Sequence, residues 1–120
     1  MIWNTGFYQK ENGEIPLKEF LRNLPEKHRA KVYWGIELLK EYGTGLREPY
    51  AKSLTGEQYK GLWELRVKFA SDISRIFYFI HIENTFILLH GFLKKTDETP
   101  KRELEIAKRY MDDYLRRCKK

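Results

Sequence analysis

The pattern of apolar and polar residues predicts three consecutive β-strands in the second half of the chain. Over Leu62–Phe69, apolar and charged residues alternate strictly from residue 63 onwards, as in a strand that buries one face. The segments Ile73–Ile82 and Thr85–Phe92 are rich in Ile, Phe, Tyr and Leu at successive positions, which is typical of strands covered on both faces. The short connections between these strands allow only tight turns, so we expect an antiparallel meander.

Helical spacing dominates the chain before this meander. Apolar residues recur at intervals of three and four from Leu17 to Leu24, after Pro16, and they predict a short helix. Pro25 ends this helix, and a second apolar stripe predicts a longer helix over Glu26–Tyr42. Because the two segments follow each other so closely, they form a helical hairpin whose apolar faces need a sheet to cover.

Weaker patterns complete the chain. Residues Ile2–Gln9 mix apolar and polar side chains and predict a first strand, and Ala51–Leu54 is compatible with a short one. After the meander, Thr99 as N-cap and Pro100 as first residue open a closing helix, whose apolar stripe extends to Leu115.

These elements follow the order β-α-α-(β)-β-β-β-α and predict a single α+β domain over residues 1–120. Strands joined by short turns give an antiparallel sheet of about four strands. We expect the first strand to lie beside the meander. We also expect the N-terminal helical hairpin and the C-terminal helix to pack mainly on one face of the sheet, leaving the other face open.

The amino-acid composition limits the kinds of protein that this chain can be. Of the 120 residues, 42% are hydrophobic and 15% aromatic, which favours a folded chain. The net charge of +6 indicates an acidic partner, with nucleic acid the first candidate. A sole cysteine, Cys118, excludes an internal disulfide and a cysteine-based zinc cluster, and the aspartates are scattered, so no metal or cofactor is expected. Neither a signal peptide nor a membrane-spanning run is visible, so we expect a soluble, cytoplasmic protein without a membrane partner.

The candidate chemistry lies in the cations that interrupt the apolar strands. Arg75 is embedded in the apolar middle strand, where a guanidinium needs a partner, and this favours a site over a bare structural pair. Arg66 is explained equally well by a site or by a cross-strand ion pair. Lys94 and Lys95 directly follow the last strand. Alone, the two lysines are typical of a solvated strand end. Together with the two arginines, they could bind a phosphodiester group.

An acid and a base would complete such a site. His90 titrates near neutral pH, although it could equally be a hydrogen-bonded core residue on the same face as Leu88. Glu48 and Glu64 are the available carboxylates for a base. Without a metal ion, cleavage is easiest on RNA, whose 2′-hydroxyl is an internal nucleophile. RNA contacts are expected from four side chains, the last by stacking on a base: Lys52, Lys60, Lys68 and Phe92.

Three blocks of sequence carry a family resemblance. They are Gly61-Leu62-Trp63-Glu64-Leu65-Arg66, Ser74-Arg75-Ile76-Phe77-Tyr78, and Leu89-His90-Gly91-Phe92-Leu93-Lys94-Lys95-Thr96 with Pro100 after it. Together they resemble the RelE/ParE superfamily of type II toxins, and most closely its HigB-like, phage-derived branch. The resemblance covers nearly the whole chain.

The resemblance implies a RelE-like fold and a toxin neutralised by a co-encoded antitoxin, often one with a helix-turn-helix DNA-binding domain. Such toxins typically cleave mRNA in the ribosomal A site without a metal ion, so the implied activity is that of an endoribonuclease, an mRNA interferase. Arg75 matches the family's arginine on the middle strand, and Arg66 matches a basic position on the strand before it. Lys94 and Lys95 fall where the family has basic residues, and Glu48 lies near a loop position that holds a catalytic glutamate in some members.

Two other functions fit the same fold. One is that of a ParE-like inhibitor, which binds DNA gyrase and cleaves nothing. The other is that of an inactive module, which contacts operator DNA only through its antitoxin. Converging cations at Arg66, Arg75 and Lys94 favour the nuclease, because a protein-binding inhibitor has no need of them.

Overall fold

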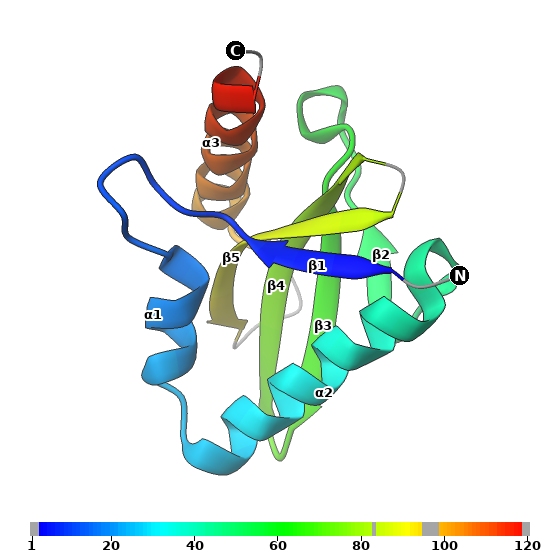
Figure 1. The fold of residues 1–120 in the computed structure, drawn as a ribbon. Helices are drawn as coiled ribbons and strands as arrows, with labels where there is room; N and C mark the ends of the chain where they lie inside the picture. The colour runs from blue at the N-terminus through cyan, green and yellow to red at the C-terminus, as the bar shows by residue number, and fades with distance from the viewer. Residues whose placement is uncertain (1–2, 83, 95–98, 119–120) are drawn as a thin grey trace.

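The computed structural model describes residues 3–82, 84–94 and 99–118. Within these ranges the chain forms a five-stranded sheet in the order β1-β5-β4-β3-β2 (Figure 1). The predicted meander is at its centre, where β3 (Trp63–Phe69), β4 (Asp72–Ile82) and β5 (Thr85–Lys94) pair antiparallel. The meander and the α+β class are therefore confirmed, with the last strand extended to Lys94.

The two remaining strands lie at the edges of the sheet. β2 (Ala51–Ser53) pairs antiparallel with β3, whereas β1 (Asn4–Phe7) pairs parallel with β5. The described sheet is therefore mixed and has five strands, where the sequence predicted an antiparallel sheet of about four. Parallel pairing is possible here because the chain passes through helices before it returns to β5. Two short 3-10 helices, η1 (Gly43–Gly45) and η2 (Glu57–Tyr59), lie on either side of β2 along the chain.

One face of the sheet is covered by α1 (Pro16–Arg22) and α2 (Glu26–Tyr42), the predicted helical hairpin (Figure 1). The apolar stripes of both helices pack against alternate residues of the strands, so that a continuous core forms beneath them. Its buried members include Leu17, Leu21, Val32, Ile36, Leu39, Leu65, Val67 and Ile76.

The opposite face is covered by α3 (Lys101–Cys118), so the expectation that the helices pack mainly on one face and leave the other open is wrong. Ala107 and Met111 of α3 form a second core with Phe77 and Phe79 of β4. Because the alternate residues of β4 on this side are aromatic, an uncovered face would expose a large apolar area to water.

A β-bulge in β5 changes which side chains face α3. Phe77 pairs with His90, but the next residue of β4 pairs with Leu88, so Leu89 has no partner across the ladder. Leu89 belongs to the core under α3, and His90 lies within hydrogen-bond distance of Glu103 on the same helix. The expectation that Leu88 shares a face with His90 is wrong, because Leu88 belongs to the core under α1 and α2.

Gly91 follows this bulge and lies close to α1. A Cβ atom at this position would be 2.6 Å from Phe20 Cδ2 and 3.0 Å from Leu17 Cδ1. We expect Gly91→Val to lower the free energy of unfolding by about 1–3 kcal/mol, because packed side chains must move to make room. Urea denaturation followed by circular dichroism measures this loss. Gly45→Ala is the control, since a Cβ there meets nothing within 4 Å, and equal stability of the two variants would contradict the close packing at Gly91.

Candidate functional site

The pairing of the strands brings most of the predicted site residues onto the face that α3 covers. Residues directly opposite one another on neighbouring strands share a face of the sheet. The register gives three cross-strand rows on this face: Lys52–Glu64–Phe77–His90, Arg66–Arg75–Phe92 and Lys68–Ile73–Lys94. Cations that are far apart in the sequence therefore lie in adjacent rows.

A buried ion pair between Arg75 and Glu64 lies in the middle of these rows. Arg75 Nη1 donates to both carboxylate oxygens of Glu64, each at 3.1 Å, and the two residues are 4% and 2% exposed. The prediction that Arg75 needs a partner is thus confirmed. Taking two charges out of water costs several kcal/mol per ion, so each group depends on the other to remain buried.

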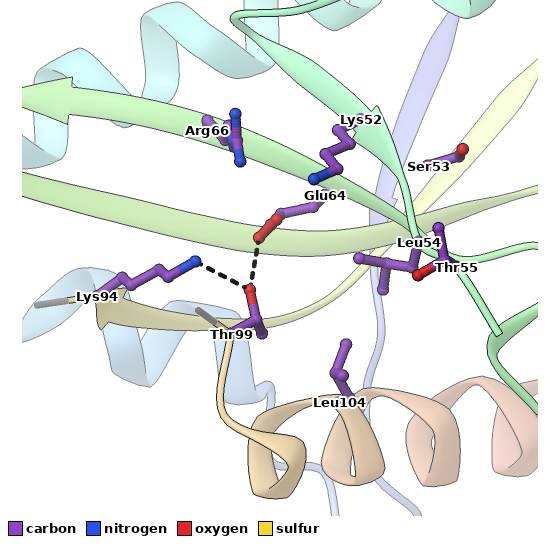
Figure 2. A pocket seen from close by; sticks show the side chains of 9 residues that line it. All are labelled: Lys52, Ser53, Leu54, Thr55, Glu64, Arg66, Lys94, Thr99 and Leu104. Carbon is purple, nitrogen blue, oxygen red and sulfur yellow. Dashed lines mark hydrogen bonds between the residues drawn. The ribbon is translucent and has the colours of Figure 1, made fainter. Parts of the chain in front are cut away.

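Glu64 is also linked to the segment that leads into α3. Thr99 Oγ1 donates to Glu64 Oε2 at 3.3 Å and accepts a hydrogen bond from Lys94 Nζ at 3.3 Å (Figure 2). Sequence analysis missed Thr99 as a site residue, because helix capping explains a threonine there equally well. Thr99 could have been identified as a site residue from its position shortly after the cationic end of the last strand.

These side chains line a pocket with a volume of about 360 Å³, called here the polar pocket. Figure 2 shows Lys52, Arg66 and Lys94 around the Glu64 carboxylate. The remaining lining residues are Ser53, Leu54, Thr55, Thr99 and Leu104. Because Arg75 already balances the charge of Glu64, the three other cations give the pocket a positive potential, and it can attract an anion such as a phosphate.

The Arg66 guanidinium forms a long ion-pair contact with Glu48. Its Nη1 lies 3.8 Å from Glu48 Oε2, and the two side chains are 26% and 67% exposed, so this contact is weak. The Nε atoms of Arg66 and Arg75 are both buried and have no hydrogen-bond partner within the described part of the chain. Buried donors without partners are uncommon in folded proteins.

His90 is held against α3 instead of lining the polar pocket. Its Nε2 lies 2.7 Å from Glu103 Oε1, and its side chain is 15% exposed. Burial lowers the pKa of His90, and the Glu103 carboxylate opposes this shift. The geometry agrees with the alternative of a hydrogen-bonded core residue, and a role in acid–base catalysis stays a prediction.

The other predicted RNA contacts are spread over the surface. Phe92 is half-buried, and its ring stacks on Phe77 with centroids 5.6 Å apart. Lys68 is exposed and lines a second pocket, which also includes Arg66. Lys60 is exposed and lines neither pocket, and Lys95 lies outside the described residues.

Among the described residues, no group of three or more His, Cys, Asp or Glu side chains could hold a metal ion. No described helix is both long enough and apolar enough to cross a bilayer.

A known protein family matches this chain. The family model described as "Phage derived protein Gp49-like (DUF891)" matches residues 19–112. This range contains every residue that lines the polar pocket. No curated protein matches the chain.

Replacing one partner of the buried ion pair tests its structural role. We expect Arg75→Met to lower the free energy of unfolding by about 3–5 kcal/mol, because Glu64 is then a buried charge without its counter-ion. The double variant Glu64→Gln/Arg75→Met should lose less than the sum of the two single variants. Chemical denaturation of all four proteins measures the coupling. Arg66→Met is the control, and a loss as large as that of Arg75→Met would contradict the central role of the pair.

The lowered pKa of His90 predicts a dependence of stability on pH. When a histidine has a lower pKa in the folded state than in the unfolded state, protonation favours unfolding. Stability is then lost as pH falls through the ordinary value of 6.5. We expect the urea midpoint of the wild type to fall more between about pH 7.5 and about pH 5.5 than that of His90→Gln. Equal slopes for the two proteins would show that His90 is not the group responsible.

Proposed function

Because the chain belongs to the phage-derived Gp49-like family, within the RelE/ParE-like toxins, we propose that it is the toxin of a type II toxin–antitoxin pair and a ribosome-dependent endoribonuclease of the HigB-like kind. The family is associated in general with toxin–antitoxin ribonucleases. The observation that carries the proposal is the polar pocket, in which cations from β2, β3 and β5 surround one carboxylate.

The proposed reaction begins with attack of the RNA 2′-oxygen on the adjacent phosphorus. The P–O5′ bond breaks as the P–O2′ bond forms, so the products carry a 2′,3′-cyclic phosphate and a 5′-hydroxyl. A base takes the 2′ proton, an acid protonates the leaving 5′-oxygen, and cations stabilise the crowded phosphorane. In this proposal all three tasks fall to protein side chains, with no metal ion.

In this proposal the cations of the polar pocket stabilise the negative charge of the phosphorane. Arg66 contacts the phosphate through its partly exposed guanidinium, and Lys52 and Lys94 add charge from either side. Arg75 acts mainly by holding Glu64 in place. Glu48 is the candidate base, because it is exposed beside Arg66.

The proposed partners follow from the same assignment. A co-encoded antitoxin, of the helix-turn-helix type, would neutralise the toxin and connect it to operator DNA. The ribosome and its mRNA would be the target, and the net charge of +6 supports docking on RNA.

Cleavage of a reporter mRNA in a reconstituted translation system tests the nuclease. We expect cuts within translated codons, present only with ribosomes, and about a hundredfold slower with Arg66→Ala, because one phosphorane-stabilising donor is lost. Primer extension over time measures the rate. Arg109→Ala is the matched control, since it also removes an exposed guanidinium but lies outside the polar pocket.

Three outcomes contradict the proposal. Intact mRNA in the presence of folded wild type would rule out the nuclease, and inhibition of DNA supercoiling by the same preparation would favour a gyrase inhibitor. Equal rates for Arg66→Ala and Arg109→Ala would place the reaction elsewhere on the surface.

A further inference from the structure

A second pocket lies next to the polar pocket, and Arg66 lines both. Its volume is about 560 Å³, and it is called here the aromatic pocket. Trp34 of α2 and Tyr50, in the segment before β2, form its apolar side together with Pro49. Lys31 and Lys68 also line it.

The two aromatic rings of this pocket form an exposed corner. Trp34 and Tyr50 are 43% and 41% exposed, and their rings meet edge to face with centroids 6.0 Å apart and an angle of 76° between planes. Lys31 Nζ lies 4.3 Å from the centroid of the Trp34 ring. A planar ligand can therefore stack on one ring and meet the edge of the other, with a cation close by.

A backbone contact fixes this corner relative to the polar pocket. The Arg66 amide donates to the Tyr50 carbonyl at 2.7 Å, so the residue that carries the aromatic ring is held directly beside β3. The Arg66 side chain, on the same residue, reaches the polar pocket. A phosphate bound to Arg66 would thus have an aromatic surface next to it.

The charge of the aromatic pocket indicates the kind of ligand. Lys31, Arg66, Lys68 and Arg75 line it, and no Asp or Glu is among its described lining residues. A purely apolar peptide anchor gains nothing from these cations, whereas a nucleotide uses both the rings and the charges.

We infer that the aromatic pocket binds the base of a nucleotide in single-stranded RNA, next to the phosphate that Arg66 contacts. This inference rests on the proposed function in one respect, that the ligand of the polar pocket is RNA. The base stacks on Trp34 or Tyr50, and Lys68 contacts the backbone that leads away from the site.

Binding of single-stranded RNA tests the inference without requiring cleavage. The probe is a labelled oligonucleotide with 2′-O-methyl groups, which block attack by the 2′-oxygen, and a matched probe lacks one internal base. Fluorescence anisotropy at low salt measures both affinities. We expect the abasic probe to bind the wild type about tenfold more weakly than the intact probe, and Trp34→Ala to lose most of this difference.

Matched variants separate stacking from loss of structure. Tyr33→Ala removes a 45% exposed aromatic ring from the same helix but outside the pocket, and it should bind as the wild type does. Trp34→Phe should keep most of the preference for the intact probe. Circular dichroism confirms that each variant is folded.

The outcomes distinguish this inference from the proposed function. Stacking-dependent binding without mRNA cleavage would support the base site and overturn the nuclease. Cleavage together with equal affinity of the wild type for the two probes would support the nuclease and overturn the base site. Absence of binding, or a defect of Trp34→Ala confined to antitoxin binding, would also overturn the inference, the latter because the occupant would then be a protein.

Discussion

The buried contact between Arg75 and Glu64 is the constraint on which the functional face depends. Two ionised groups inside a sheet are stable only while each keeps the other in hydrogen-bond distance and both stay covered. The cover comes from the segment before α3, where the Thr99 hydroxyl completes the contacts of Glu64. The helix that closes the second core therefore also closes one side of the polar pocket, so that fold and site are stabilised together.

The three central strands were predictable, because each has an apolar pattern within its own sequence. The pairing of the edge strands and the face that each helix covers were not predicted correctly. Parallel pairing of β1 with β5 depends on a contact between segments that are far apart in the sequence, and no local pattern contains it. The position of α3 was predictable in principle, since Phe77 and Phe79 alternate with Ile76 and Tyr78 and both faces of β4 therefore need cover.

The candidate site was predictable by residue type but not by geometry. An arginine in an apolar strand signals a partner, but Glu64 is two positions away from the residue directly opposite Arg75. That diagonal relation depends on the register, which is set by the turn at Ala70 and Ser71. The expectation that Leu88 and His90 share a face was wrong for a similar reason, because a one-residue bulge reverses the alternation of side chains in β5. The apolar pattern also does not mark Trp34 as a binding residue, because single exposed aromatic side chains are common on helices.

The arrangement of charge explains why an anion should bind at this face. Arg66 and Arg75 lie directly opposite each other on neighbouring strands, where like charges repel and destabilise a sheet. Glu64 offsets the charge of one arginine, and the exposed Glu48 is too distant and too well solvated to offset the other fully. In the proposed function, a phosphate between Arg66 and the lysines of the polar pocket would relieve the repulsion that remains. Binding energy and local stability would then have the same origin, and a ligand with a phosphate next to an aromatic base would occupy both pockets at once.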